Sequence, residues 1–458
     1  MNYCLKLMGI LSLANLLGCS SLPQRDQQSM WADIPGQWAT VNVPPDPIEP
    51  TWVNTFADIK LSSLVADALR YNFDLKAAAA RVSIAQEQAT IAGAGRLPQL
   101  AFAPGYQESR QAYAAGSEAN YFAAFSALFS LSWEIDLWGR IKASQNALQQ
   151  DAEAVAADFQ AARLSLAART AQSYFELLEA DLQIKVAEQS IQDRKVIANF
   201  VRGRFTRGLS RGLDLRLVLT DLANAEAQLA EARNRKQSVT RRLEVLLGRY
   251  PSGQLISAVA LPPPPANLKA GVPSALIERR PDLAAAYLRL RAMDYRVESA
   301  RQALLPRITL TAGGGTSSAA LTDLVDPRAV AWNLALGLVQ PLFTGGRLSG
   351  EIRLNEARTV EALNQYRSTA LNAFREVEQT LAAEVWLKAQ EQALKEAVQQ
   401  TQASRKLAVY SYRQGLIEIL TLLDSYRSTL NAQSAHLSVQ RQLLSNRIEL
   451  YLALGGSV

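Results

Sequence analysis

Two kinds of hydrophobic periodicity alternate along the chain. From Leu61 onward, apolar residues recur at the i, i+3, i+4, i+7 spacing of an amphipathic helix. From Tyr121 to Glu134, apolar residues alternate with small or polar ones at a period of two, which is typical of a strand with one apolar face. Both patterns occur again in the second half of the chain. We therefore expect helices joined by pairs of strands.

The helical patterns are unusually long. The first predicted helix runs from Leu61 to about Arg96, where Leu97-Pro98 interrupts it. The next runs without Pro or Gly from Ile141 to Arg202, a rod of roughly 90 Å at about 1.5 Å per residue. Its apolar residues are spaced as in a coiled coil, which is also compatible with a spectrin-like bundle. After a turn with three glycines, a return helix covers about Leu213 to Leu247.

Four strands are predicted, at about 98–110, 121–134, 306–318 and 330–343. About twelve residues tilted by about 45° cover roughly 28 Å, the thickness of bilayer hydrocarbon. Four strands cannot close a barrel, and lipid does not tolerate open sheet edges, so such a barrel would be shared between chains. A passage requires three chains, because side chains fill a barrel of about eight strands. The alternative is a water-soluble sandwich with one buried face.

The two halves of the chain follow one plan. Gly139-Arg140 recurs as Gly346-Arg347 at a spacing of 207, and Leu97-Pro98 recurs as Leu305-Pro306 at 208. A period this long indicates a duplicated domain rather than a solenoid. The expected division is a signal peptide (1–18), an N-terminal segment (19–60), repeat 1 (61–248), a linker (249–273), repeat 2 (274–455) and a short tail (456–458).

The N-terminus carries a targeting segment. Lys6 precedes a short apolar run that ends in Leu16-Leu17-Gly18-Cys19, which resembles the lipobox of bacterial lipoproteins. We expect cleavage before Cys19 and a covalent lipid on its thiol. Cys4 lies in the removed segment, so the mature chain has no second cysteine for a disulfide. The alternative is a plain secretory signal with an incidental Cys19.

Composition excludes several function classes. The 458 residues include 48% hydrophobic ones and carry a net charge of +6, with no basic run that would indicate nucleic-acid binding. No apolar run is long enough for a transmembrane helix. The sole histidine, His436, has no partner at ligand spacing, and no Cys nucleophile or phosphate loop occurs. We expect no catalytic residues, no metal site and no cofactor apart from the lipid.

With these residues assembled, the chain resembles the TolC family of outer membrane channels, in particular its lipid-anchored OprM/NodT-like branch. The resemblance rests on the lipobox, Arg280–Leu283 (RPDL), the Gly345–Arg347 turn and Tyr412–Asp424. It implies an α+β membrane protein: a homotrimer with a 12-stranded transmembrane β-barrel, four strands per chain, continued by a periplasmic α-helical barrel. The resemblance also implies that the N-terminal segment, the linker around Pro262–Pro265 and the tail form a belt around that barrel.

The function implied by this resemblance is the exit duct of a tripartite efflux pump. Its partners would be a periplasmic adaptor and an inner-membrane transporter of the RND type. The alternatives are a duct for type I protein secretion and a structural lipoprotein without transport.

The resemblance also places a periplasmic gate. Leu420 and Asp424, one helical turn apart, match residues that form constricting rings in the family, and Tyr412 and Arg427 match residues that hold the tips shut. The chain departs from TolC in having Thr421 in place of a second Asp. It also has Ile417 in place of a nearby Arg. We therefore expect the contacts that hold the gate closed to differ from those in TolC. The alternative is that Asp424 and Arg427 form only a surface pair.

Two matched turns are expected to be the tips that dock the adaptor. They are Arg207–Ser210, with Gly208 and Leu209, and Gln414–Ile417, with Gly415 and Leu416. Glycine at both matched positions predicts a backbone conformation that a side chain would hinder. The alternative is that they are only tight turns.

Overall fold

The computed structural model describes residues 35–40, 52–111, 120–255, 260–265 and 270–456. Cys19 and the expected signal peptide lie outside these residues. The chain divides into two compact units. The first contains Arg81–Ala156 and Ala285–Arg367, and the second contains Trp31–Ala80, Ala157–Ala284 and Ser368–Val458.

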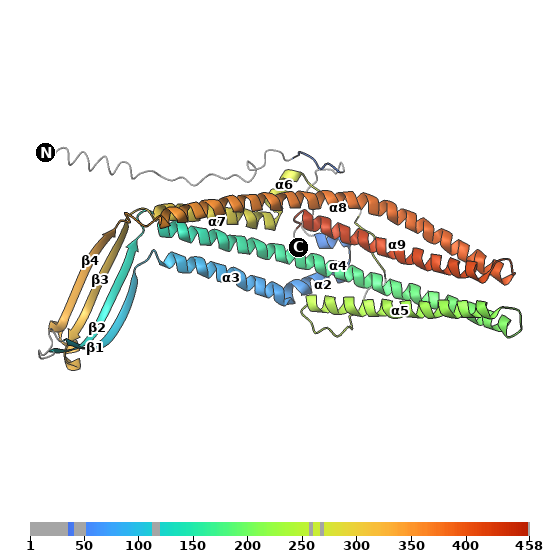
Figure 1. Ribbon diagram of the computed structural model, residues 1–458, viewed down its shortest axis with the longest axis horizontal. Helices are drawn as coiled ribbons and strands as arrows, with labels where there is room; N and C mark the ends of the chain where they lie inside the picture. Colours follow the sequence, from blue (N-terminus) through green and yellow to red (C-terminus); the bar gives the residue numbers. More distant parts are fainter. Residues whose placement is uncertain (1–34, 41–51, 112–119, 256–259, 266–269, 457–458) are drawn as a thin grey trace. The chain divides into compact units, whose positions relative to one another are not determined.

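The first unit contains a four-stranded antiparallel sheet in the order β1-β2-β3-β4 (Figure 1). Its strands are β1 (Gln99–Gln111), β2 (Asn120–Ile135), β3 (Arg307–Ser318) and β4 (Val330–Val339). Each repeat supplies one hairpin, and the β2–β3 ladder joins the two repeats. Within the described chain, β1 and β4 each pair with one strand only, so both outer edges retain unpaired backbone groups.

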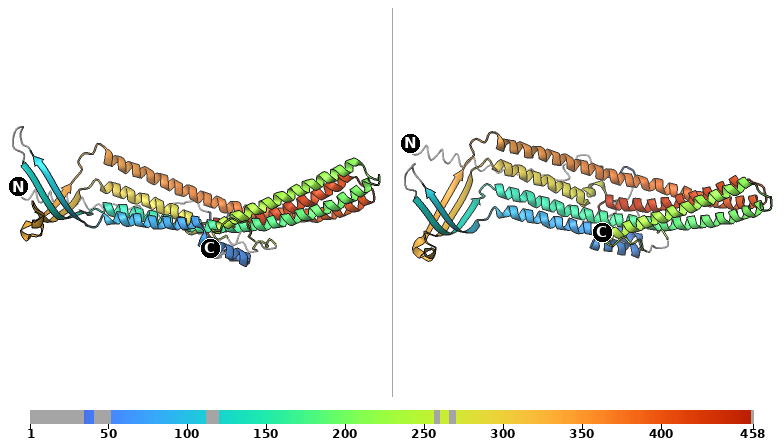
Figure 2. Two further views of the ribbon diagram at one scale, coloured as in Figure 1. Left: turned by 90° about the horizontal axis from the view of Figure 1, so that it is seen from below. Right: turned by 60° about the horizontal axis from the view of Figure 1, so that its bottom comes forward.

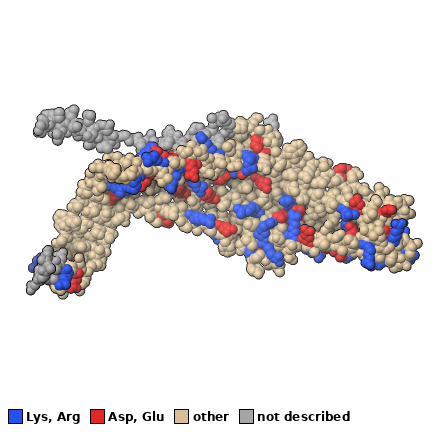
Figure 3. Space-filling view, in the orientation of Figure 1, with Lys and Arg blue, Asp and Glu red and all other residues tan. Residues whose placement is uncertain are grey.

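One face of this sheet is apolar from edge to edge. The register places Leu100 opposite Leu131, which lies opposite Ala312, which lies opposite Leu334. From Trp332 onward, every second residue of β4 is a large apolar one that is at least 64% exposed: Trp332, Leu334, Leu336 and Leu338. In Figure 3 the strands are almost free of charged side chains except near one end of the sheet. No second sheet covers this face in the described residues, so the sandwich alternative is wrong.

Two predicted boundaries were wrong. Strand β4 ends at Val339 rather than 343, because Pro341 has no N–H for a ladder and the Gln340 side chain instead donates to the Leu304 carbonyl at 2.9 Å. The first predicted helix is two helices, α2 (Ile59–Tyr71) and α3 (Phe73–Ala94), with Asn72 between them in an extended conformation (ψ 129°).

Two long helical hairpins make up most of the second unit, and the longer helix of each hairpin begins in the first unit. The first hairpin is α4 (Arg140–Phe205) with α5 (Gly212–Leu246), and the second is α8 (Arg347–Arg413) with α9 (Ile419–Ala453). The remaining helices in the described residues are shorter: η2 (Trp52–Phe56), α6 (Pro273–Arg279), α7 (Pro281–Gln302), η3 (Leu321–Val325) and η4 (Pro327–Ala329).

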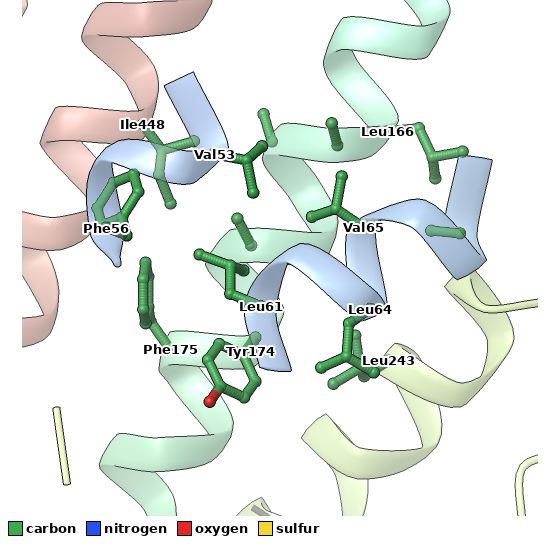
Figure 4. Close-up of a cluster of buried hydrophobic side chains, with 14 of the residues drawn as sticks. Val53, Phe56, Leu61, Leu64, Val65, Leu166, Tyr174, Phe175, Leu243 and Ile448 are labelled. Carbon is green, nitrogen blue, oxygen red and sulfur yellow. The ribbon is translucent and has the colours of Figure 1, made fainter. Parts of the chain in front are cut away.

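The main core of the second unit lies where η2 and α2 pack against α4, α5 and α9 (Figure 4). Phe56 packs against Phe175 with ring centroids 5.3 Å apart, and Trp52 stacks on Tyr451 at 5.9 Å. The Tyr174 hydroxyl donates to the Asp58 carboxylate that also caps α2. Burial, followed by this carboxylate, raises the pKa of Tyr174.

Segments flanking the repeats pack on the same unit. The Trp38 indole donates to the Gly271 carbonyl at 3.0 Å. The buried Arg447 guanidinium donates to the Pro265 carbonyl at 2.8 Å and pairs with Glu384 at 2.6 Å. Burial alone would raise the pKa of Glu384, but Arg447, together with Lys388, outweighs burial and holds that pKa below its usual range. The proline-rich linker is therefore anchored to α8 and α9.

The Gly-Arg sequence occurs in both repeats for a local structural reason. Gly139 has φ +82° and Gly346 has φ +83°, a left-handed conformation that only glycine adopts without strain. Each glycine directly precedes the first residue of a long helix, α4 or α8. In the first repeat, the Asp136 carboxylate also accepts from the first backbone N–H groups of α4.

A second matched feature is a hydrogen bond in each repeat. It joins the end of the return helix to the residue between the first two helices of the same repeat. The Asn72 side chain donates to the Leu246 carbonyl at 3.0 Å, and Arg280, 208 residues later, donates to the Ala453 carbonyl at 3.0 Å. Both side chains satisfy carbonyls at a helix C-terminus. Arg280 also pairs with Asp282 and Glu376, which explains the RPDL sequence.

A glycine follows the return helix of each repeat at a matched position. Gly248 has φ +68° and Gly455 has φ +69°. A Cβ atom would lie 2.5 Å from the Tyr71 carbonyl oxygen at Gly248, and 3.0 Å from the Arg279 carbonyl oxygen at Gly455. The distance at Gly248 is too short for a Cβ beside backbone, and the distance at Gly455 is tight. Gly248 is therefore required for two independent reasons, its positive φ and this close approach.

We predict that Gly248→Ala lowers the apparent melting temperature of the detergent-purified protein more than Gly208→Ala does. Both glycines have positive φ, which costs about 1–3 kcal/mol for another residue, but a Cβ at Gly208 meets nothing within 4 Å. Differential scanning calorimetry of the two variants separates strain from steric overlap. Equal losses in both variants would show that the close approach to Tyr71 contributes nothing.

Candidate functional site

Both helical hairpins turn in the same way. After α4, the Leu209 N–H donates to the Arg204 carbonyl at 2.9 Å, and after α8 the Leu416 N–H donates to the Ser411 carbonyl at 2.9 Å. These are the hydrogen bonds of a Schellman motif, in which the preceding residue is left-handed. Gly208 and Gly415 indeed have φ of +73° and +74°. The predicted conformational need for glycine at both tips is confirmed.

The two turns lie beside each other in both views of Figure 2. Each presents one leucine outward: Leu209 is 62% exposed and Leu416 is 72% exposed. Neither leucine belongs to the hydrophobic core beneath the turns. The two tips therefore share their backbone geometry and an exposed apolar side chain at the same position.

The core beneath the tips joins the two hairpins. It contains Ile197 and Val201 from α4, Val218 from α5, and Leu422 and Leu423 from α9. Tyr412 is buried in this core, with its ring centroid 6.2 Å from that of Phe200. Burial, followed by the Asp214 carboxylate, raises the pKa of Tyr412. Tyr412 therefore contacts the first hairpin rather than pointing away from the chain.

The other three predicted gate residues lie on the opposite face of α9. Leu420 is 52% exposed, and Asp424 and Arg427 are also exposed, whereas Leu423 and Tyr426 on the same helix are buried. The spacing of four and three residues places the exposed side chains on one face. In the described chain no ion pair joins Asp424 to Arg427. The gate and its surface-pair alternative both stay predictions.

A buried aromatic ring lies between two arginines behind this face. Tyr426 is 6% exposed, and its ring centroid is 5.8 Å from the Arg194 Cζ and 5.7 Å from the Arg405 Cζ. Arg194 pairs with Asp221 at 2.6 Å, and Arg405 pairs with Asp193. Burial, followed by Asp193, raises the pKa of Tyr426.

This cluster connects all four helices near the tips, and sequence reasoning missed it. Arg194 and Asp221 link α4 to α5 within the first hairpin, whereas Asp193 and Arg405 link α4 to α8 between the hairpins. Their partners lie 27 and 212 residues apart. No local spacing rule reaches that far, so only the Arg and Asp residue types were visible in the sequence.

His436 has one hydrogen-bond partner, which lies far from it in the sequence. Its Nε2 lies 2.8 Å from Glu391 Oε1 on α8. Two groups do not make a metal site, and the described residues contain no group of three or more His, Cys, Asp or Glu side chains placed to bind an ion. The helices that the structure describes include none with the length and hydropathy needed to cross a membrane.

Comparison with known proteins identifies the family. The model for the outer membrane efflux protein family matches the chain twice, over residues 64–249 and 272–456. The chain belongs to this family. It is 34% identical to the pyoverdine export outer membrane protein OpmQ of Pseudomonas putida, with 88% of this chain and 87% of OpmQ covered. It is 29% identical to the probable outer membrane lipoprotein SilC of Salmonella typhimurium, covering 99% and 98%.

Solved structures agree with this assignment. The open state of the Neisseria gonorrhoeae MtrE outer membrane channel superimposes with a TM-score of 0.82 and 27% sequence identity, covering 96% of this chain and 98% of that one. The fold is therefore that of the trimeric outer membrane channels, with a β domain and a helical barrel. Outer membrane residence, expected from the sequence, is confirmed.

We predict that removing each of the two carboxylates in the cluster around Tyr426 lowers the stability of the protein by a different amount. Asp221→Asn leaves the buried Arg194 unpaired and should destabilise the protein by about 3–5 kcal/mol. Asp193→Asn removes a partner of the more exposed Arg405 and should cost about 1 kcal/mol or less. Chemical denaturation of the purified variants measures both. A larger loss for Asp193→Asn would contradict the burial argument.

Proposed function

We propose that this outer membrane efflux channel is the exit duct of a tripartite pump, joined at its tips by a periplasmic adaptor and supplied by an inner-membrane transporter of the RND type. The supporting observation is the arrangement of side chains around the second tip, at the end of α8 and the start of α9. The chain packs Tyr412 and Tyr426 inward and leaves Leu420, Asp424 and Arg427 exposed immediately after the second tip. In a trimer with α9 inside the helical barrel, three copies of this face surround one axis.

Three copies of Leu420 and Asp424 make a gate on that axis. The leucines narrow the passage, and the carboxylates one turn further on repel one another unless cations lie between them. Thr421 and Ile417 supply no charge to the ring. Closure therefore depends on Leu420 packing and on the contacts of Tyr412 rather than on a second ring of acids. The single acidic ring makes the closed state sensitive to salt.

The lipid anchor belongs to this proposal as well. The Leu16–Cys19 sequence supports acylation of Cys19, and the similarity to SilC, a probable outer membrane lipoprotein, supports it independently. An acyl chain at Cys19 holds the N-terminus at the membrane but is not needed for the sheet to insert, because the sheet has its own apolar face.

We predict that replacing both Leu420 and Asp424 with Ala raises single-channel conductance in planar bilayers and admits vancomycin to cells that lack the adaptor. The reason is that the substitution removes the bulk and the charge of the ring while leaving the buried face of α9 intact. The matched control is Leu213→Ala with Leu217→Ala, the equivalent positions of the first repeat. Conductance that stays at the wild-type level in a fully assembled double variant would place the constriction elsewhere.

A further inference from the structure

The apolar face of the sheet carries charge near one end only. The β1–β2 ladder is unbroken, so every second residue of β1 from Leu100 to Arg110 lies on this face. Two of these residues, Glu108 and Arg110, are charged and exposed. In the described parts of β2, β3 and β4, the residues that share this face are all uncharged. Figure 3 shows the same gathering of charge near one end of the strands.

The charged end of the sheet is the extracellular one. The four junctions with helices all lie at the opposite end: β1 and β3 begin after α3 and α7, whereas β2 and β4 lead into α4 and α8. In this family of outer membrane channels the helices extend into the periplasm. The hairpin ends of the strands therefore lie on the outer side of the membrane.

Arg110 lies at the outer boundary of the hydrocarbon. From Gln99 to Arg110 the strand rises about 26 Å, at about 3.3 Å per residue and a tilt of about 45°. The apolar band of a transmembrane barrel is also about 25 Å tall. Below Arg110 the face is aromatic, with the ring centroids of Phe102 and Phe129 4.8 Å apart. This depth is that of the lipid headgroups of the outer leaflet.

The Arg110 guanidinium lies against an aromatic ring. Tyr121 is directly opposite Arg110 in the ladder, and the Arg110 Cζ is 5.9 Å from the centroid of its ring. Tyr121 is itself 71% exposed. Among the described residues Arg110 has no ion pair. Because a guanidinium has five N–H donors, it retains donors for an acceptor that comes from the membrane.

The carboxylate nearest to Arg110 on this face has a different partner. The Tyr106 hydroxyl donates to Glu108 at 3.0 Å, and Tyr106 and Arg110 lie on opposite sides of Glu108 along β1. No ion pair joins Glu108 to Arg110 in the part of the chain that the structure describes. The bond to Tyr106 therefore holds the acid on the side away from the guanidinium.

We propose that Arg110, held over the Tyr121 ring, binds a phosphate group of the glycolipid of the outer leaflet. The ligand is of the lipid A class, a phosphorylated disaccharide with several acyl chains. The phosphate would accept two parallel hydrogen bonds from the guanidinium, and the acyl chains would lie along the aromatic face below it. Each protomer of the trimer would carry one such site. The proposal goes beyond the exit-duct function and does not depend on it.

A phospholipid of the inner leaflet fits this face less well. Its headgroup would meet the opposite end of the strands, where the residues on the face are apolar: Leu100, Trp133, Ile308 and Leu338. No charged side chain of the described strands lies on the face at that level. The competing account is that Arg110 only extends its charge into water and binds no particular lipid.

The test titrates the detergent-purified trimer with lipid A and counts bound lipids by native mass spectrometry. The two probes are bisphosphorylated lipid A and the same lipid with both phosphates removed. The wild-type trimer should bind the phosphorylated form about tenfold or more tightly than the other. Equal affinities would overturn the proposal whether or not any variant assembles, because the site would then ignore phosphate.

Substitution of Arg110 locates the preference. Arg110→Gln should lower affinity for bisphosphorylated lipid A about tenfold and leave affinity for the dephosphorylated form within about twofold. Arg110→Lys should fall between wild type and Arg110→Gln, because an ammonium keeps the charge without the planar pair of donors. A phosphate preference that persists in Arg110→Gln would place the site elsewhere.

The matched control is Arg328→Gln, which removes one exposed arginine from η4, between β3 and β4 at the same end of the sheet. Arg328 already pairs with Asp326 at 2.7 Å. Binding of bisphosphorylated lipid A should therefore stay within about twofold of wild type. An equal loss in Arg328→Gln and Arg110→Gln would show that only net charge acts, and the proposal would fail.

Phosphatidylglycerol tests the choice of leaflet. Its binding should be weaker than that of bisphosphorylated lipid A and the same in wild type and Arg110→Gln, since this lipid would lie elsewhere on the face. Phosphatidylglycerol that binds as tightly as lipid A, with the same dependence on Arg110, would contradict the assignment to the outer-leaflet glycolipid.

Discussion

The structure depends on the hydrogen bonds that β1 and β4 cannot make within one chain. A strand edge in hydrocarbon leaves N–H and C=O groups without water, and each unsatisfied group costs several kcal/mol. The sheet is exposed and apolar on one face, so lipid is its natural surrounding, yet it has two open edges. Pairing β4 of one copy with β1 of the next resolves this, and repetition of that contact generates a closed ring.

Because the chain is duplicated, the two edge strands that make this contact come from related repeats. The two repeats share left-handed glycines at three pairs of matched positions: before the long helices, at the tips, and after the return helices. Between these fixed points the repeats have diverged. Asn72 and Arg280 satisfy equivalent carbonyls with different side chains. The shared backbone keeps the architecture regular, while the side chains of the two halves differ.

Much of the fold could be predicted from the sequence because its signals are local. Period-two alternation gave the strands to within a few residues, and the uninterrupted run before Arg202 gave α4. The break at Asn72 was missed because no Pro or Gly marks it: the Asn72 side chain stabilises it by bonding to Leu246, 174 residues away. The cluster around Tyr426 was missed for the same reason. The gate positions came from family resemblance. The structure adds that Tyr412, at the end of α8, is buried, whereas the other three lie exposed on α9.

Native mass spectrometry of the protein extracted in mild detergent tests the central claim most directly. If the unpaired edges of the sheet are satisfied only by neighbouring copies, the predominant species should be a trimer that does not dissociate on dilution. Stable monomers or dimers whose strands remain protected from hydrogen exchange would contradict the account, because the edges would then be satisfied without a ring of three.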